Sequence, residues 1–472
     1  MKSILLAVAG LTLTAGAAAA EMPLRTDQQA FLGLYRELVE TNTTLSEGSC
    51  TAAADKMAAR LRTGGLPDSA ITLFSVPEHP REGGLVAVYP GSNPRLKPML
   101  LLAHLDVVEA KRADWQRDPF KLIDEGGYYY GRGTVDDKLQ AAIWTDTLIR
   151  LASSKERPRR TIKLALTCGE ETSGAFNGAE WLAKHHKDWI DAEFALNEGG
   201  GGRTDGKGLD EGGKLVSQSI QIGEKAYQDF TLTVTNPGGH SSQPVRDNAI
   251  YVLGDALAKV RDLEFPLQFN PVTREYFRGA GAVRGGEVGA AMIALAANPG
   301  DKAAEAVVNQ DKMLHSLLRT TCVATLTEAG HALNALPQRA TANVNCRMFP
   351  GRTAAETQAA LSAAIGNPAV EIKPRVTDKP IAIPPTLDPK IVGPVEALAK
   401  TYFPGVPVIP SMSTGATDAV YTGAAGIPTY GVPSAWTNPD GNGTHGLDER
   451  VEKRALYTAR DYLYDLVRAL AK

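Results

Sequence analysis

An apolar run at residues 161–166 leads into two adjacent carboxylates, Glu170 and Glu171. Neighbouring carboxylates at the end of a buried strand are costly unless a cation meets them, because burial and mutual repulsion both disfavour their charged forms. Further residues that can bind metals lie before and after this pair: His104, Asp106, Asp136, Asp137, Glu198 and His445. Together they predict a hydrolase that uses two metal ions.

The chain is long enough for more than one domain. Its 472 residues exceed what one ordinary hydrophobic core holds, so two domains are expected. Hydrophobic residues make up 43% and charged residues 22% of the sequence, as in soluble globular proteins. The net charge of −3 gives no reason to expect binding to nucleic acid or to an anionic membrane.

The N-terminus has the pattern of a secretory signal peptide. A basic start at Lys2 is followed by a short apolar core at residues 4–13 and by small residues up to Ala20. The apolar run is too short to span a bilayer, which argues against a membrane anchor. We expect cleavage after Ala20 and a periplasmic or secreted mature protein without a membrane segment.

Four cysteines remain after the predicted cleavage. Cys322 and Cys346 lie in two strand-like runs that can pair across a hairpin, so they are the expected disulfide. Cys168 precedes Glu170 by two residues and is expected to be a buried thiol. No cysteine and histidine spacing indicates a thiolate metal site.

Helical and strand patterns alternate in the first part of the mature chain. Helical periodicity covers residues 27–40, 52–64 and 138–153, and short strand-like runs cover residues 85–89, 99–103, 161–166 and 194–196. This alternation predicts an α/β layered domain with a largely parallel sheet.

The pattern changes near residue 224. A strand, a helix and two more strands are expected at residues 230–235, 248–263, 320–326 and 340–348, which is typical of a small α+β unit with an antiparallel sheet. The α/β pattern resumes after a proline-rich stretch at residues 374–389. We therefore expect a domain at 224–376 inserted between two segments of another, 21–223 and 377–472. The polar, partly helical residues 266–318 are not placed by the pattern.

Candidate ligands occur where the expected strands end. His104 and Asp106 share one face of a strand, so one of them can bind a metal while the other hydrogen-bonds the imidazole. Glu198 also follows an apolar run, and sites gather at the carboxyl ends of strands in α/β sheets. In the glutamate pair, one carboxylate can bind metal while its neighbour accepts a proton from water.

The remaining candidates have ordinary alternatives. Asp136 and Asp137 begin a helix, where aspartates are common capping residues, but Asp136 could instead bridge two cations. His445 precedes the last helix. A histidine, a carboxylate and a bridging carboxylate around each ion suit zinc, with cobalt and manganese as alternatives.

The combination of motifs resembles the family of di-zinc exopeptidases that includes glutamate carboxypeptidase, aminoacylase, acetylornithine deacetylase and succinyl-diaminopimelate desuccinylase. Residues 269–276 are similar to its carboxypeptidase-S-like branch. The sequence departs from the common pattern at Leu139 and at Val108-Glu109, and its insert is longer. The matching stretches span most of the mature chain: 104–106, 131–138, 169–171, 197–200, 237–242, 334–337 and 345–351.

The resemblance implies a three-layer catalytic domain and an inserted lid. It also implies that His104, Asp136 and Glu198 hold one zinc, and that Asp136, Glu171 and His445 hold the other. Glu170 would be the general base, and Asp106 would tune His104. From the lid, His240 would stabilise the oxyanion, often in a partner's active site, while Asn334 and Arg347 would hold the substrate and its carboxylate. The lid often carries a dimer interface, which allows a homodimer.

The expected reaction is hydrolysis of an amide bond next to a free C-terminal carboxylate, with a peptide or an N-acyl amino acid as substrate. An N-acyl-amino-acid deacylase, a dipeptidase and an aminopeptidase are alternatives within the same family. A periplasmic binding protein that has lost catalysis is the alternative from another class, and the presence of Glu170 with a full set of ligands argues against it.

Overall fold

The computed structural model describes residues 23–172, 174–375, 380–381, 383–384 and 386–472. The predicted signal peptide, residues 1–20, lies outside the described residues. Within the part of the chain that is described, no helix is both long and apolar enough to cross a membrane.

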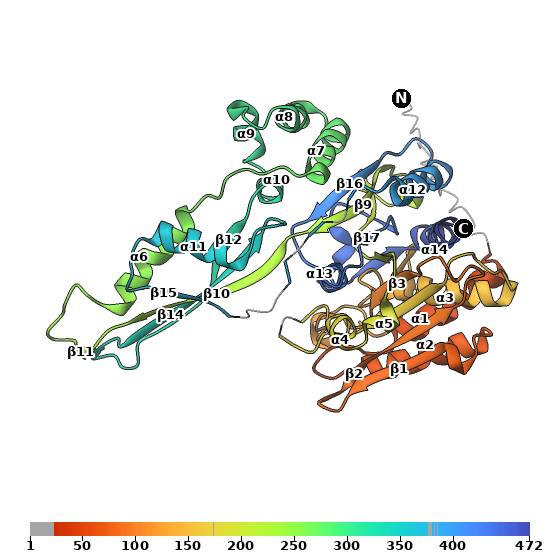
Figure 1. Ribbon diagram of the computed structural model, residues 1–472, viewed down its shortest axis with the longest axis horizontal. Coiled ribbons are helices and arrows are strands. Elements are labelled where there is room, and N and C mark those ends of the chain that lie inside the picture. The colour runs from red at the N-terminus through yellow and green to blue at the C-terminus, as the bar shows by residue number, and fades with distance from the viewer. Residues whose placement is uncertain (1–22, 173, 376–379, 382, 385) are drawn as a thin grey trace, which may run out of the picture.

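A ten-stranded sheet forms the larger half of the molecule (Figure 1). Its strand order is β1-β2-β6-β3-β7-β17-β9-β8-β18, and β16 also pairs with β9. The four central strands β6, β3, β7 and β17 run parallel to one another, in agreement with the predicted parallel sheet. The strands are β1 (Ile71–Val76), β2 (His79–Tyr89), β3 (Met99–His104), β6 (Ile162–Thr167), β7 (Phe194–Asn197), β8 (Gly201–Thr204), β9 (Leu215–Glu224), β16 (Val408–Ser413), β17 (Thr429–Gly431) and β18 (Trp436–Thr437).

Helices cover both faces of this sheet, which gives three layers. Leu101 of β3 packs in the cluster formed with α1, α2, α3, α12 and α14, whereas its neighbours Leu100 and Leu102 pack in the cluster formed with α4 and α5. This division follows from the alternation of side chains along a strand. The helices are α1 (Thr26–Val39), α2 (Cys50–Thr63), α3 (Lys138–Ser154), α4 (Gly178–His185), α5 (Lys187–Ile190), α12 (Pro389–Tyr402), α13 (Ala419–Ala424) and α14 (Lys453–Leu470).

The end of the chain returns to the large sheet. Strand β17 lies between β7 and β9, so residues after the insert complete a sheet that begins before it. A small three-stranded sheet beside it joins the two segments again, because β19 pairs with β5. Its strands are β4 (Ile123–Glu125), β5 (Tyr128–Tyr130) and β19 (Arg450–Glu452).

A separate four-stranded antiparallel sheet, which we call the lid sheet, extends away from the large sheet (Figure 1). Alternate residues of β10, such as Phe230 and Leu232, are buried under α6 and α11. The two-stranded ribbon of β11 and β13 forms the distal tip. The elements are β10 (Ala226–Thr235), β11 (Gly239–His240), α6 (Ala249–Asp262), β12 (Thr321–Ala329), β13 (Ala335–Leu336), β14 (Arg339–Met348), α11 (Ala354–Ile365) and β15 (Glu371–Pro374).

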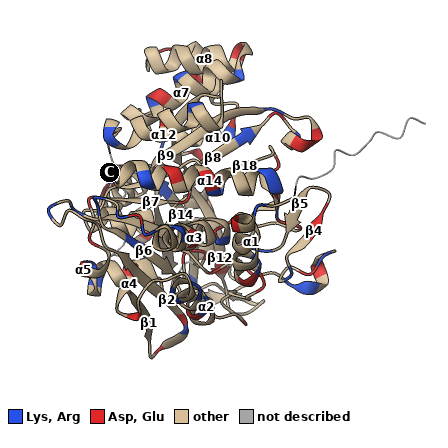
Figure 2. Cartoon of the chain, turned by 90° about the vertical axis from the view of Figure 1, so that its right-hand side faces the viewer, with Lys and Arg blue, Asp and Glu red and all other residues tan. Residues whose placement is uncertain are grey.

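The residues that the sequence pattern left unplaced form four helices. Val272, Phe277, Met292 and Leu314 belong to the same hydrophobic cluster as the helices of the large sheet, not to the core of the lid sheet. Figure 2 shows α7 and α8 above β8 and β9. We call this segment the helical insertion: α7 (Pro271–Arg284), α8 (Gly286–Ala297), α9 (Lys302–Val308) and α10 (Lys312–Leu317).

The four cysteines form two disulfides. The predicted Cys322–Cys346 bond is confirmed, and it joins directly paired residues of β12 and β14. The prediction of a free thiol at Cys168 was wrong, because this residue is bonded to Cys50. Cys50 is the first residue of α2 and Cys168 follows β6, and the packing of α2 against the sheet brings their Cα atoms to 6.0 Å. A separation of 118 residues left no local signal for this pairing.

Candidate metal centre and active site

The candidate ligands converge at one edge of the large sheet. His104 is the last residue of β3, Glu198 directly follows β7, and Glu170 and Glu171 come shortly after β6. Because these three strands are adjacent and parallel, their carboxyl ends meet at the same edge. Asp136 reaches this edge from the turn before α3, where the peptide bond to Asp137 is cis.

The first group of ligands is built around His104. Its imidazole is buried, with 2% of the residue exposed. The Nε2 atom lies 3.1 Å from Oδ1 of Asp136 and 3.7 Å from Oε1 of Glu198. These three atoms therefore face a common point.

The second group is built around His445. Its Nε2 atom lies 2.9 Å from Oδ2 of Asp136 and 3.0 Å from Oε2 of Glu171. Asp136 thus directs one carboxylate oxygen toward each histidine. This is the arrangement expected of a carboxylate that bridges two cations.

The geometry and charge of these residues fit metal ions. Tetrahedral zinc ligands at about 2.0–2.1 Å from the metal are separated from one another by roughly 3.3 Å, close to the distances between these atoms. Oxygen and nitrogen atoms of His104, Asp136 and Glu171, and likewise of His104, Glu170 and Glu198, all lie within 4.8 Å of one another. Among the described residues, the ion pairs of Asp136, Glu171 and Glu198 are with histidine alone.

The pKa values of the candidate ligands and of Glu170 reflect their burial and their closeness to one another. Burial raises the pKa of Glu198 well above its usual range and that of Glu170 to about 9. Hydrogen bonds that the His445 imidazole donates to the carboxylates of Asp136 and Glu171 raise the pKa of His445 to about 10. Cations between these groups would favour the ionised carboxylates and the neutral imidazoles.

Asp106 contacts one residue in each of the two groups of candidate ligands. His104 Nδ1 lies 3.0 Å from the backbone oxygen of Asp106, a contact that leaves Nε2 directed at the candidate metal position. The Oδ2 atom of Asp106 accepts a hydrogen bond of 3.0 Å from the backbone of Glu171. One residue therefore orients a ligand from each group.

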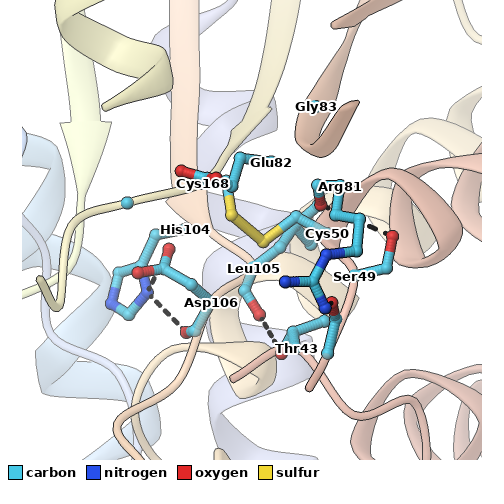
Figure 3. The surroundings of a disulfide bond; sticks show 12 residues. Thr43, Ser49, Cys50, Arg81, Glu82, Gly83, His104, Leu105, Asp106 and Cys168 are labelled. Atoms are coloured by element: carbon cyan, nitrogen blue, oxygen red, sulfur yellow. Dashed lines mark hydrogen bonds and ion pairs between the residues drawn. A yellow bond between two sulfur atoms is a disulfide. The ribbon is translucent and has the colours of Figure 1, made fainter. Parts of the chain in front are cut away.

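The Cys50–Cys168 disulfide lies directly beneath this edge (Figure 3). Figure 3 shows the bond beside His104 and Asp106, and its Cys50 end is the first residue of α2. Cys168 is followed by Gly169, whose φ of +95° and 1.8 Å approach between an added Cβ and the backbone of Phe176 leave room only for glycine. The bend that presents Glu170 and Glu171 is thus fixed by a covalent bond and by a tight turn.

Two buried acids that support the site were not among the predicted residues. Glu449 accepts hydrogen bonds from the backbone of Gly133, Val135 and Asp136, and so holds the turn that presents the bridging carboxylate. Asp418 accepts hydrogen bonds from Thr167 and Asn177, on either side of the glutamate pair. Both lie far along the chain from the groups they hold, so sequence spacing gave no signal.

The predicted lid residues occupy two different places. Arg347 lies on β14, where its guanidinium stacks over the ring of Tyr227 at 4.7 Å. Burial lowers its pKa, while Tyr227 and nearby acids, including Glu170, oppose that shift. His240 and Asn334 lie at the distal tip, where Ser241 donates a hydrogen bond of 3.0 Å to the backbone of Asn334. Within one chain, the structure does not bring these two residues to the candidate metal ligands (Figure 1).

The fold and the convergent ligands define a metal-dependent hydrolase with a lid. The comparison with protein families gives the same class, because residues 100–469 match the model of peptidase family M20/M25/M40. The chain belongs to this family.

Relatives and solved structures agree with this assignment. Human N-fatty-acyl-amino acid synthase/hydrolase PM20D1 is 28% identical over 391 residues, which cover 80% of this chain and 75% of the relative. Carboxypeptidase S of Saccharomyces cerevisiae is 30% identical over 289 residues, which cover 57% of this chain and 48% of the relative. The M20 family metallo-carboxypeptidase Sso-CP2 from Sulfolobus solfataricus shares the fold, with a TM-score of 0.71 at 18% identity over 95% of this chain and all of the other.

Proposed function

We propose that this enzyme hydrolyses an amide bond next to a free carboxylate and uses two zinc ions. The observation that carries the proposal is Asp136, whose two carboxylate oxygens face His104 and His445 separately. His104, Asp136 and Glu198 would hold one ion, and Asp136, Glu171 and His445 the other. When bound, the ions polarise the substrate carbonyl and make a water molecule acidic near neutral pH.

The chain's own residues supply the proton transfers and the orientation. Glu170 follows the bend fixed by Gly169 and is not among the residues proposed as ligands, so its carboxylate would accept a proton from the attacking water and pass it to the leaving amine. Asp106 would keep the Nε2 atom of His104 directed at the metal through the contact at Nδ1.

The lid would supply groups that bind the substrate. Arg347 offers a planar guanidinium near the catalytic edge, suited to a substrate carboxylate. His240 and Asn334 lie too far away within one chain, because a ten-residue strand such as β14 spans on the order of 30 Å. We propose that the protein is a homodimer through the lid, in which these residues complete the partner's site.

Two substrate classes remain, and both carry the required carboxylate. A carboxypeptidase would cleave a peptide, as the similarity to carboxypeptidase S suggests, whereas an acyl-amino-acid hydrolase would cleave a fatty or other acyl group from an amino acid, as the name of PM20D1 suggests. A dipeptidase or aminopeptidase would instead require a free amine. The two disulfides support a periplasmic or secreted location, because such bonds persist in oxidising compartments.

A substrate panel tests the proposal. Purified enzyme is assayed with blocked peptides, N-acyl amino acids and free dipeptides, each with zinc, with cobalt or manganese, and after chelation. We expect hydrolysis of substrates that have a free carboxylate, loss of activity after chelation and recovery with zinc. Absence of both bound metal and hydrolysis would favour a binding protein, and activity restricted to free amines would favour a dipeptidase or aminopeptidase.

A further inference from the structure

A large cavity opens directly beside the candidate metal ligands. Its volume is about 800 Å³, within the range of pockets that bury most of a drug-sized ligand. Asp136 and Glu198 lie in its wall at one end, and the helical insertion forms the wall at the other. Any group that enters this cavity therefore extends away from the bond that is cleaved.

The wall changes in character from one end to the other. The metal end is polar: beside the carboxylates lies Gln140, which is 2% exposed and whose amide nitrogen has no hydrogen-bond partner among the described residues. The insertion end is largely apolar, with side chains from three helices and one strand. These are Tyr276, Ala280 and Val283 of α7, Met292 of α8, Leu314 of α10 and Ile409 of β16.

Two of the charged residues in the cavity wall compensate each other. Arg284 of α7 and Asp311, the residue before α10, form an ion pair of 2.9 Å. This pair also ties two helices of the insertion together. Arg203 of β8 also lies in the wall and has no ion pair among the described residues, so one positive charge stands beside the apolar side chains of the insertion end. Apart from this residue, the insertion end offers mainly apolar contact.

We propose that the helical insertion forms the pocket for the acyl side of the substrate and makes the enzyme prefer a long aliphatic acyl group. This inference rests on the proposed hydrolysis and assigns the acyl specificity to α7, α8 and α10. The substrate would place its amide at the polar end and its chain along Ala280, Val283 and Met292. Each methylene that becomes buried should raise kcat/KM about four-fold until the cavity is filled.

Paired substitutions on α7 test the assignment. Ala280→Phe places a ring at the cavity wall and obstructs part of the cavity, whereas Ala282→Phe places the same ring on an exposed position of the same helix outside the cavity wall. Val283→Trp, at a position that is 40% exposed, narrows the cavity with less disturbance of the core. The substrates are acetyl, octanoyl and dodecanoyl derivatives of one amino acid.

We expect kcat/KM of the unaltered enzyme to rise with chain length. Ala280→Phe and Val283→Trp should lower kcat/KM for the dodecanoyl substrate at least ten-fold and leave the acetyl substrate unchanged, and Ala282→Phe should change neither. Equal loss on all substrates, or no dependence on chain length, would overturn the inference even if the enzyme hydrolyses the acetyl substrate.

A binding measurement separates failure of this inference from failure of the proposed function. Calorimetry with dodecanoate needs no turnover. Binding that is weakened ten-fold by Ala280→Phe and unaffected by Ala282→Phe would support the pocket even if no amide is cleaved. Absence of dodecanoate binding, or equal binding to both variants, would contradict it.

Discussion

The metal-facing edge of the large sheet and the distal tip of the lid sheet are built in opposite ways. At the edge, His104 is 2% exposed and is fixed by Asp106 on one side and faces Asp136 on the other. At the tip, His240 is exposed, and its Nδ1 atom receives hydrogen bonds from the backbone and hydroxyl of Ser242 alone among the described residues. The first region brings its candidate ligands together within one chain, whereas the second presents an exposed histidine far from them.

Buried charge explains this difference. The edge concentrates acids whose repulsion must be offset by cations, so the surrounding chain holds them with hydrogen bonds from several segments. The exposed tip does not bury repelling acids in this way, and a two-stranded ribbon is enough to hold it. Rigid preorganisation is therefore found where charge is buried, and exposed residues remain free to meet another surface.

The largest expected effect is at the edge itself. Glu170→Gln removes a proton acceptor while preserving size, so kcat should fall about 10²–10⁴-fold with zinc content unchanged. Glu171→Gln is the matched variant and should instead lower zinc content, because this carboxylate is proposed as a ligand. Activity and metal analysis of both proteins would distinguish the roles, and near-normal turnover of Glu170→Gln would remove this residue from the mechanism.

A slightly smaller effect is expected at the tip. His240→Ala should lower kcat about 10²–10³-fold, the usual loss for one oxyanion donor, whereas His331→Ala, also exposed on the lid, should not. Mixing His240→Ala with Glu170→Gln should recover roughly a quarter of the activity if two-fold dimers reassociate at random. No recovery after confirmed subunit exchange would show that the tip does not act on a partner.

One disulfide lies at the metal-facing edge, and the other lies in the lid sheet at the end away from the distal tip, so the stability of the two sheets can be compared. Replacing Cys50 and Cys168 with alanine opens a loop of 118 residues and should cost about 4–5 kcal/mol of unfolding free energy in the chain-entropy account. Replacing Cys322 and Cys346 opens a loop of 24 residues and should cost about 3 kcal/mol. Denaturant unfolding measures both, and an equal cost would contradict the ordering by loop length.

The last expected effect is a dependence of stability on pH at Glu224, the last residue of β9 before the lid sheet. Burial raises the pKa of Glu224 to about 8. Its Oε2 atom accepts hydrogen bonds from the backbone and the hydroxyl of Thr417, and its Oε1 atom has no partner among the described residues. The protonated acid therefore contributes stability that is present below about pH 4.5 and lost as pH rises through about 8.

Glu224→Gln should flatten this dependence, which for one proton has a slope of at most about 1.4 kcal/mol per pH unit. Unfolding measured from pH 4 to pH 9 tests the prediction. The exposed Glu328→Gln serves as the control and should leave the slope unchanged. An unaltered slope in the Glu224 variant would show that this carboxyl does not carry the effect.

Some features could be predicted because they depend on neighbouring residues. The helix at residues 138–153 and its observed counterpart α3 differ by one residue, because the apolar periodicity and the preceding turn both mark its limits. His104, Glu171 and Glu198 could be proposed as ligands because each follows an apolar run, and an apolar run in an α/β chain predicts a strand that ends at the functional edge.

Other features could not be predicted because they join distant segments. Three such features depend on how helices pack over the sheet. They are the Cys50–Cys168 bond, the hydrogen bonds that Glu449 accepts from the turn before α3, and those that Asp418 accepts. The helical insertion was the least predictable region. Its polar sequence did not indicate whether it would cover the lid sheet or the large sheet.

The sequence by itself indicated the candidate metal ligands and placed His104, Glu171 and Glu198 near the ends of strands, because hydrophobic periodicity is a local property of the chain. Only the tertiary structure decided which of these residues meet. It placed both oxygens of Asp136 between two histidines, left His240 at a remote tip and set α7 beside a cavity at the metal-facing edge. These outcomes depend on packing between segments hundreds of residues apart, which no local pattern specifies.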